Sequence, residues 1–270
     1  MALDEHLRSL VERWALAPDG EPIVTRSSRL LPVLYGGRPA MLKVATEPEE
    51  KWGAGLMVWW DGIGAARVLA HEGDAILIER ATGSRSLADM ARHGEDDRAS
   101  LIMCETVAGL HAPRKAPPPE LVPLSVRFRG LLSTGEGGVF ARCADAARLL
   151  LAEPRDVVPL HGDVHHGNIL DFGDRGWLAI DPKRLEGERG FDYANLFCNP
   201  DHATALKPGR LARQAEVVAE AAQLERGRLL HWILAWAGLS AVWLIEDGET
   251  EHVAPTLRVA EIAAAEIDRD

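Results

Sequence analysis

The 270-residue chain contains the segment His161-Gly162-Asp163-Val164-His165-His166-Gly167-Asn168, followed by Ile180-Asp181-Pro182. Asp163 and Asn168 lie five positions apart, a spacing that spans a tight loop. Asp181 follows an expected strand over residues 177–180 and would emerge at the strand end beside that loop. Mg²⁺ prefers oxygen ligands, so Asn168 and Asp181 together with nucleotide phosphates make a credible metal site. The pattern H-x-D-x-x-x-x-N is typical of phosphoryl transfer from ATP, with Asp163 as the base for a substrate hydroxyl.

Two other interpretations of this segment remain open. One is a polar turn whose histidines satisfy backbone groups. The other is a metal cluster formed by His161, Asp163, His165 and His166, because Zn²⁺ favours imidazole nitrogens.

A lysine upstream fits the phosphoryl-transfer interpretation. Lys43 lies in the alternating segment Ala40-Met41-Leu42-Lys43-Val44, which predicts a strand with Lys43 turned toward a cleft. There it can neutralise the α- and β-phosphates, if an acid on the next helix holds it. Glu50 and Glu49 are the candidates, and the choice between them stays open.

Further nucleotide contacts are expected in the same region. A glycine-rich phosphate loop is missing, and Ser27 and Ser28 stand where it would be expected. Their amides and hydroxyls can face phosphate. The backbone from Glu79 to Ala81, at the connection to the following region, can hydrogen-bond an adenine.

The chain divides into two regions of different character. Residues 1–80 are mostly short strands with one internal helix over 47–60, and Gly36-Gly37 marks a hairpin between two of the strands. Residues 81–270 are mainly helical, apart from a short-strand region over 154–181. We therefore expect an α+β protein with a small β-rich lobe over residues 1–80 and a larger helical lobe over 81–270.

Composition excludes several classes of protein. The net charge is −11 and no basic stripe stands out, which argues against a nucleic-acid partner and fits a cationic small substrate. The three cysteines are far apart, and the N-terminal residues lack a signal pattern, so we expect a cytoplasmic protein. The apolar run 229–245 comes close to the length of a membrane span, but a buried core helix is favoured. Oligomeric state cannot be read from the sequence.

The motifs together resemble the aminoglycoside phosphotransferase family, and within it the streptomycin 6-kinase and hydroxyurea phosphotransferase branch. The resemblance rests on 161–170 and 176–182, supported by 64–69, 190–195 and 239–241. It implies a protein-kinase-like, two-lobed fold and the cofactors ATP and Mg²⁺. Asp163 would be the catalytic base, Asn168 and Asp181 the metal ligands, and Lys43 with Glu50 the phosphate-binding pair.

The resemblance also implies a substrate. The expected reaction transfers the γ-phosphoryl group of ATP to the 6-hydroxyl of streptomycin and so gives antibiotic resistance. Streptomycin has guanidinium groups, which pair best with carboxylates, so Glu246, Asp247, Glu249 and Asp192 are candidate ligands. Asp192 has an alternative role as a brace for the catalytic loop. The alternative functions are a kinase of another small alcohol (a sugar, an amino alcohol or hydroxyurea) and a nucleotide-binding pseudo-enzyme.

Overall fold

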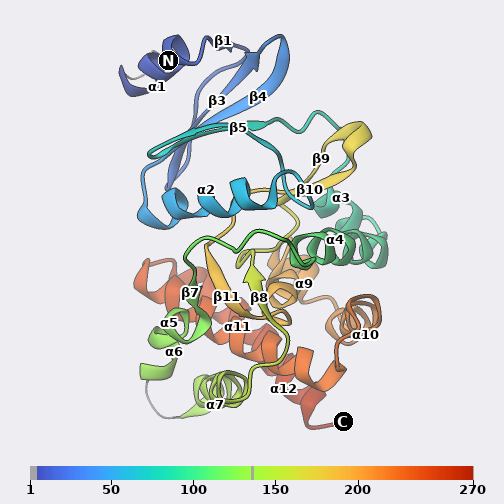
Figure 1. Cartoon of the computed structure of the whole chain (residues 1–270). Helices are drawn as coiled ribbons and strands as arrows, with labels where there is room; N and C mark the ends of the chain where they lie inside the picture. The colour runs from blue at the N-terminus through green and yellow to red at the C-terminus, as the bar shows by residue number, and fades with distance from the viewer. Residues whose placement is uncertain (1–4, 135–136, 270) are drawn as a thin grey trace.

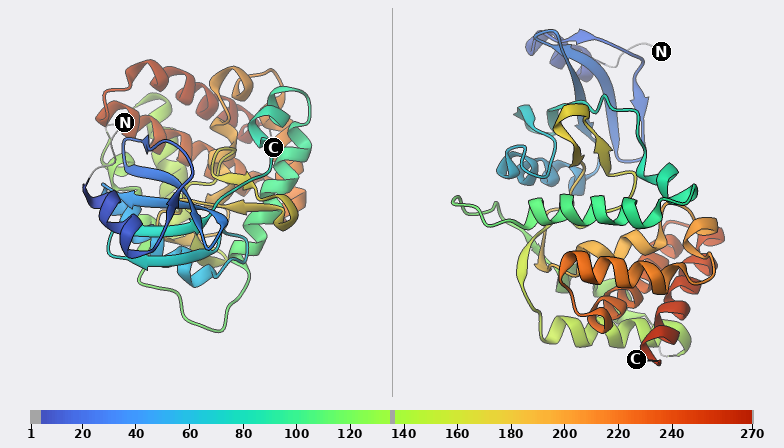
Figure 2. Two further views of the ribbon diagram at one scale, coloured as in Figure 1. Left: turned by 90° about the horizontal axis from the view of Figure 1, so that it is seen from above. Right: turned by 90° about the vertical axis from the view of Figure 1, so that its right-hand side faces the viewer.

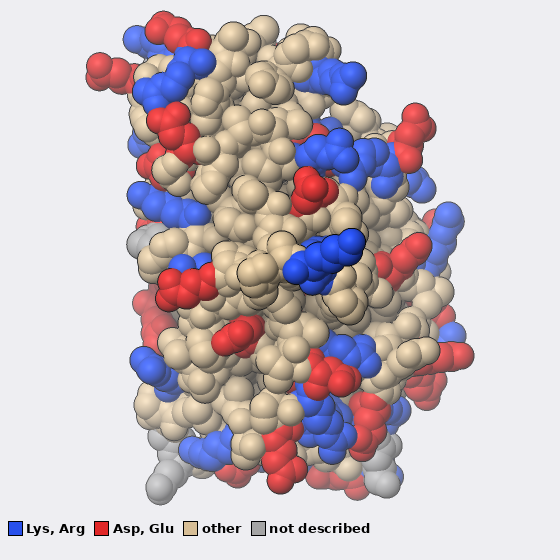
Figure 3. All heavy atoms as spheres, viewed as in Figure 1, with Lys and Arg blue, Asp and Glu red and all other residues tan. Residues whose placement is uncertain are grey.

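The computed structural model describes residues 5–134 and 137–269, apart from the side chains of residues 48–50. The chain forms an upper lobe built on a β-sheet and a lower lobe of helices (Figure 1). This is the α+β, two-lobed arrangement that the sequence predicts. Basic and acidic side chains are interspersed on the face shown in Figure 3, as expected when both signs occur along most elements.

The upper lobe is an antiparallel sheet in the order β1-β3-β4-β6-β5, with β2 paired to β3, within the described part of the chain. A β-turn at Gly36-Gly37 joins β3 to β4, and both glycines have positive φ, as the predicted hairpin requires. The strands are β1 (Ala17–Pro18), β2 (Ile23–Val24), β3 (Ser28–Tyr35), β4 (Arg38–Ala45), β5 (Val68–Glu72) and β6 (Ala75–Glu79).

The two faces of this sheet have different roles. Leu42 on β4 belongs to a buried cluster with Leu7 and Leu10 of α1 (Glu5–Arg13). Because neighbouring side chains of a strand point to opposite faces, Lys43 faces the other way, toward α2 (Pro48–Trp60). Lys43 is therefore on the cleft side, as the alternation in the sequence predicts.

A hairpin from the second half of the chain joins the upper lobe. Strands β9 (Ile169–Asp171) and β10 (Trp177–Ala179) are connected through the 3₁₀ turn η1 (Gly173–Arg175), and β10 bridges Ala65 in the segment that leads into β5 (Figures 1 and 2). The Ala66 N–H donates to the Ala179 carbonyl at 2.9 Å. The sequence division at residue 80 does not anticipate this return of the chain.

The connection between the lobes is held on the same hairpin. Gly83 N–H donates to the Asp171 carbonyl at 2.9 Å, and the Arg85 guanidinium binds the Asp171 carboxylate through Nε at 2.7 Å and Nη2 at 2.8 Å. This bidentate hydrogen bonding to Arg85 lowers the pKa of the Asp171 carboxyl group. A side chain at Gly83 would overlap the Asp171 carboxylate, so glycine is required for the approach.

The lower lobe is mainly helical. Its α-helices are α3 (Leu87–Arg92), α4 (Asp96–His111), α5 (Leu124–Arg127), α6 (Arg129–Ser133), α7 (Gly138–Ala152), α8 (Phe191–Ala194), α9 (His202–Ala205), α10 (Arg210–Ala222), α11 (Arg226–Glu246) and α12 (Val253–Ile267). Two 3₁₀ turns, η2 (Asn195–Cys198) and η3 (Thr250–His252), and a small sheet of β7 (Val122–Pro123), β11 (Leu185–Glu188) and β8 (Val157–Leu160) complete it.

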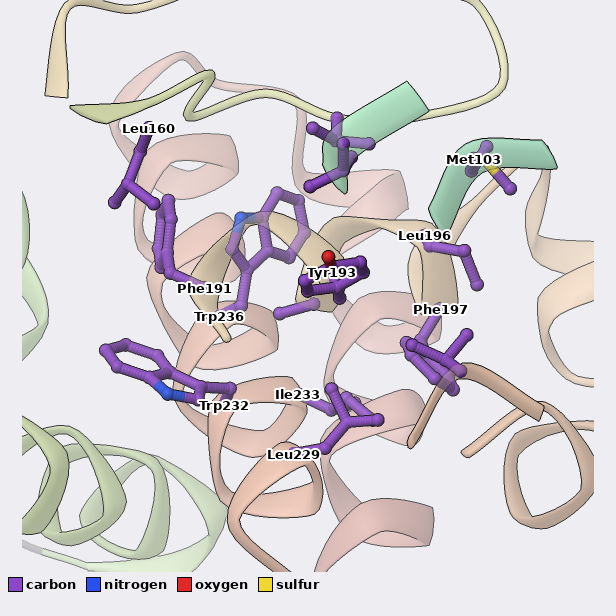
Figure 4. Packing of buried hydrophobic residues seen from close by; sticks show 14 of the residues in the cluster. Met103, Leu160, Phe191, Tyr193, Leu196, Phe197, Leu229, Trp232, Ile233 and Trp236 are labelled. Carbon is purple, nitrogen blue, oxygen red and sulfur yellow. The ribbon is translucent and has the colours of Figure 1, made fainter. Parts of the chain in front are cut away.

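Helix α11 is the centre of the lower lobe. By length and composition it is the one described helix that could cross a membrane, but 67% of its apolar window is buried inside the protein. Trp232 is 1% exposed and packs edge-on against Phe191 (Figure 4). Trp236 contacts Trp243 in the same way. These contacts are those of a core helix, as favoured from the sequence.

Candidate active site

The loop over residues 161–168, which the sequence predicts to be the catalytic loop, places Asp163 and Asn168 side by side. The Asn168 Nδ2 group donates to the Asp163 backbone carbonyl at 2.9 Å and to Asp163 Oδ2 at 3.3 Å. Because both partners are acceptors, the amide nitrogen is turned toward Asp163 and Asn168 Oδ1 faces away from it. The second Asp163 oxygen, Oδ1, accepts a hydrogen bond from Asn195 Nδ2 at 2.9 Å.

Asp192 lies beneath the catalytic loop. Its carboxylate accepts hydrogen bonds from the backbone N–H groups of Gly162 at 2.7 Å and His161 at 2.9 Å, and lies 2.8 Å from His111 Nε2. Its side chain is 0% exposed. The expectation that Asp192 contacts substrate is therefore wrong, because a fully enclosed carboxylate cannot reach a ligand in the cleft. The position is that of the brace considered as its alternative.

His161 connects the two halves of the site. Its Nδ1 accepts the Asp163 N–H at 3.2 Å, so the proton is on Nε2, which donates to the Ile180 carbonyl at 2.8 Å. Burial lowers the pKa of His161, and burial likewise lowers the pKa of His166 to about 3. Both rings are neutral at physiological pH. The His161 ring joins the backbone of the loop at Asp163 to the backbone at Ile180.

Asp181 and Lys43 meet across the cleft. Ile180 N–H donates to the Asn168 carbonyl at 2.9 Å, which places Asp181 next to the catalytic loop. Lys43 Nζ lies 2.7 Å from Asp181 Oδ1, and the lysine side chain is only 7% exposed. Asp181 has φ +61°, a left-handed conformation that non-glycine residues rarely adopt and that is concentrated at functional sites.

The acid expected to hold Lys43 is Glu49 or Glu50. The side chains of Glu49 and Glu50 lie outside the described residues, so the choice between them stays a prediction.

A pocket between the sheet and α2 contains the Lys43–Asp181 pair. Its lining residues are Lys43, Ala45, Gly53, Ala54, Met57, Asp74, Ile76, Ile78, Asp181 and Pro182. The approach of α2 is very close, since a Cβ added at Gly53 would lie 2.2 Å from the Pro182 carbonyl oxygen. Glycine at this position is therefore a condition for the geometry of the pocket.

The two serines expected at the phosphates lie at the turn between β2 and β3. Ser28 pairs with Ala45 on the cleft face of the sheet. Its hydroxyl is buried without a hydrogen-bond partner among the described residues. The Ser27 carbonyl accepts the Thr46 N–H at 2.8 Å, just before α2 begins. An unpaired buried hydroxyl on this face is a group that a ligand can satisfy.

The connection expected at the adenine begins where β6 ends. The Glu79 carboxylate accepts the Arg67 N–H at 2.6 Å and pairs with Arg175 of η1. Ala81 is partly buried against the main hydrophobic cluster. The side chain of Glu79 and its backbone N–H, which donates to the Arg67 carbonyl at 3.0 Å, are thus committed to the upper lobe. The carbonyl of Glu79 and the backbone of Ala81 stay the predicted contact.

The three acids expected at the substrate lie at the end of α11. Asp247 accepts hydrogen bonds from Arg26 Nη2 at 2.6 Å and Nη1 at 2.8 Å, and Glu249 Oε1 lies 3.6 Å from the same guanidinium. Arg26 belongs to the turn between β2 and β3, so the pair joins the two lobes. Glu246, Asp247 and Glu249 are all exposed. A carboxylate pair that binds the guanidinium of Arg26 is chemically suited to a guanidinium on a ligand.

Two residues near Asp163 escaped the sequence-based prediction. Asn195 reaches it from η2, and Lys183 Nζ lies 3.9 Å from Asp163 Oδ2. Asn195 is 32 positions from Asp163 and its contact depends on the path of the chain after Asp192. Lys183 was detectable, because it lies two residues after Asp181 at the same strand end.

The donor set fits magnesium better than zinc. Among the described residues no group of three or more histidines, cysteines or acids is arranged to hold a metal ion. Both ring nitrogens of His161 are occupied by backbone groups. Asn168 and Asp181 instead carry an amide and a carboxylate oxygen on segments joined by the hydrogen bond from the Ile180 N–H to the Asn168 carbonyl. Such an incomplete oxygen set is the kind that Mg²⁺ uses together with phosphates.

Known proteins resemble this chain in sequence and in fold. Residues 13–248 match the family model described as aminoglycoside/hydroxyurea antibiotic resistance kinase. The chain is 54% identical to streptomycin 3''-kinase of Klebsiella pneumoniae, over 88% of this chain and 92% of that protein. It is 34% identical to streptomycin 6-kinase of Streptomyces griseus, over 94% and 87% of the two chains.

A solved structure extends the likeness to the fold. A thermostable mutant of aminoglycoside phosphotransferase APH(4)-Ia, crystallised in a ternary complex with ADP and hygromycin B, superposes with a TM-score of 0.68 at 14% identity. The match covers 95% of this chain and 96% of that one. The fold is therefore the kinase-like fold of the aminoglycoside phosphotransferases, and the chain belongs to the aminoglycoside/hydroxyurea antibiotic resistance kinase family.

Proposed function

We propose that this protein is an ATP-dependent streptomycin kinase. The observation that supports it best is the meeting of Lys43, Asp163, Asn168 and Asp181 around one cleft, from three separate segments of the chain. A nucleotide-binding pseudo-enzyme would be expected to lack one of these groups. Positioning and electrostatic stabilisation are the main needs of phosphoryl transfer, and this set supplies both.

Asp163 would orient the acceptor hydroxyl and take its proton. The acceptor oxygen forms a bond to the γ-phosphorus, the bond from that phosphorus to the β,γ-bridging oxygen breaks, and ADP leaves with the electron pair. The hydroxyl proton passes to the Asp163 carboxylate late in the reaction. Asn195 and Asn168 fix the carboxylate, so its orientation is set before substrate arrives.

The nucleotide would bind between the sheet and α2. Lys43 would contact the α- and β-phosphates, Ser27 and Ser28 would face the phosphates from the β2–β3 turn, and the backbone of Glu79 and Ala81 would contact the base. Mg²⁺, when bound through Asn168 and Asp181, would neutralise charge on the phosphates.

The acidic end of α11 would bind the cationic substrate. Asp247 and Glu249 already bind the guanidinium of Arg26, and Glu246 is adjacent to them. Streptomycin presents the same functional group. We propose the 3''-hydroxyl as the acceptor instead of the 6-hydroxyl expected from the motifs, because identity to the 3''-kinase is 54% and to the 6-kinase 34%.

The test is mass spectrometry of streptomycin after incubation with the protein, ATP and Mg²⁺. We expect one added phosphoryl group, and NMR of the product would give the carbon that bears it. Hydroxyurea, a sugar and an amino alcohol in parallel reactions test the other small alcohols. The matched control is Asp163→Ala, which should bind nucleotide but leave streptomycin unmodified. Phosphorylation of another acceptor in preference to streptomycin would reject the substrate assignment.

A further inference from the structure

Lys183 lies next to Asp163, the carboxylate proposed to react with the acceptor hydroxyl. Its Nζ is 3.9 Å from Asp163 Oδ2, and its side chain is 16% exposed. Its backbone N–H donates to the His161 carbonyl at 2.7 Å, one of the shortest backbone contacts of the catalytic loop. The lysine is therefore fixed to the loop through its main chain, and its ammonium group approaches Asp163.

The two oxygens of Asp163 are not equivalent. Oδ1 accepts a 2.9 Å hydrogen bond from Asn195, whose own Oδ1 is held by Asn199 Nδ2 at 2.8 Å. Asn195 is 4% exposed, so this amide is enclosed and cannot be displaced by substrate without loss of its contacts. Oδ2 has the longer 3.3 Å contact with Asn168. The oxygen available to an incoming hydroxyl is Oδ2, which is also the oxygen that Lys183 approaches.

A cation beside the acceptor hydroxyl would stabilise the charge of the transferred group. In phosphoryl transfer the negative charge is spread over the three equatorial oxygens of the γ-phosphoryl group. Lys43 is 2.7 Å from Asp181, on the nucleotide side of the cleft. A hydroxyl bonded to Asp163 Oδ2 would bring the γ-phosphorus toward Lys183 Nζ, which lies 3.9 Å from that oxygen.

We propose that Lys183 is a catalytic residue that donates a hydrogen bond to the γ-phosphoryl group during its transfer. The proposal rests on the kinase function proposed above. The competing role is structural, in which Lys183 only neutralises Asp163. The two roles differ in a measurable way, because the first requires a γ-phosphoryl group and the second does not.

Binding of two nucleotides separates these roles. We would measure the affinities of AMP-PNP and ADP, each with Mg²⁺, for the wild type and for Lys183→Met. We expect AMP-PNP affinity to fall about tenfold or more while ADP affinity changes less than about twofold. In an Asp163→Ala background the same selective loss should persist. Lys115→Met is the matched control, since Lys115 is an exposed lysine in the loop before β7.

Turnover gives the second readout. Removal of one preorganised donor to a transition-state charge lowers kcat by about 10²–10³-fold, and we expect a loss of this size in Lys183→Met with KM for streptomycin little changed. Lys183→Arg retains the positive charge and should have a kcat between those of Lys183→Met and the wild type. If Lys183→Met does not fold, Lys183→Arg takes its place in the nucleotide and turnover measurements.

Equal losses of ADP and AMP-PNP affinity, or a kcat within about threefold of wild type, would overturn the proposal. The nucleotide measurements need no acceptor. A wild type that modifies no acceptor would therefore reject the proposed function, while the ADP and AMP-PNP comparison would still decide the role of Lys183.

Discussion

Replacement of Asp192 by asparagine tests how the catalytic loop is held. The carboxylate accepts the Gly162 N–H on Oδ1 and the His161 N–H on Oδ2, and His111 Nε2 also contacts Oδ2. An amide of the same shape keeps one acceptor and places a donor at the other position. In either orientation of the new amide, a donor faces a backbone N–H that it cannot satisfy.

The magnitude follows from the bonds lost. A hydrogen bond to a charged group contributes about 1.5–3 kcal/mol, and an unsatisfied buried donor costs about 1–3 kcal/mol. We therefore expect Asp192→Asn to lower the free energy of unfolding by about 3–5 kcal/mol, the range measured when one partner of a buried pair is removed. For a chain of this length, that loss corresponds to a decrease in Tm of about 5–9 °C.

The assay combines urea unfolding followed by circular dichroism with steady-state kinetics. We expect a lower unfolding midpoint and a lower kcat, because the loop that positions Asp163 is less well fixed. Asp145→Asn is the matched control, because its exposed carboxylate on α7 has no proposed role in the site and its loss should change stability by no more than about 0.5 kcal/mol. Wild-type stability in Asp192→Asn together with a raised KM for streptomycin would refute the brace and restore Asp192 as a substrate ligand.

Three further predictions concern the cleft and the core. Gly53→Ala should lower kcat/KM for ATP by about tenfold or more, because the new Cβ would lie 2.2 Å from the Pro182 carbonyl oxygen and push α2 away from Asp181, at a cost of about 1–3 kcal/mol. The control is Gly55→Ala, whose Cβ would have its nearest neighbour at 3.9 Å and whose kcat/KM should stay near that of the wild type. Equal kcat/KM in the two variants would contradict the close packing of α2 on Pro182. Asn195→Ala should lower kcat by about tenfold with little effect on nucleotide affinity, because Asp163 Oδ1 loses the hydrogen bond that orients the carboxylate. An unchanged kcat would show that the Asn195 amide does not orient Asp163. Burial alone would raise the pKa of Glu188, but hydrogen bonds from Arg228, Trp232 and Arg155 outweigh it and lower that pKa. The stabilisation from Glu188 is therefore complete above its unfolded pKa of about 4.3 and is lost as pH falls through the folded value. The free energy of unfolding of the wild type should exceed that of Glu188→Gln by about 3 kcal/mol at pH 7, and this difference should become smaller below about pH 4. Urea unfolding at several pH values measures it, and a difference that does not change with pH would argue against the Glu188–Arg228 ion pair.

Local patterns in the sequence predicted the parts of the site that depend on one segment. The spacing of Asp163 and Asn168 predicted a tight loop, and Asn168 Nδ2 closes it with a 2.9 Å hydrogen bond to the Asp163 carbonyl. The alternation around Lys43 places it on the face of β4 opposite Leu42, because strand side chains have a period of two. The hairpin at Gly36-Gly37 was also predictable from local sequence, because both turn residues have positive φ, a conformation that favours glycine.

The contacts that join distant segments were harder to predict. Asn195 reaches Asp163, and Arg26 reaches Asp247 across 221 positions, only because of how the lobes pack. Asp192 was expected among the substrate carboxylates because its charge is visible in sequence, whereas its burial is not. The attachment of β9 and β10 to the upper lobe likewise depends on tertiary bonds between Ala66 and Ala179.

The most direct test of the whole account is the fate of streptomycin in a reaction with ATP and Mg²⁺, compared between the wild type and Asp163→Ala. We predict a singly phosphorylated product, with the phosphate on the 3''-oxygen, from the wild type and none from the variant. Unmodified streptomycin with the wild type, or equal product from both proteins, would contradict the assignment of Asp163 and its neighbours as the phosphoryl-transfer site.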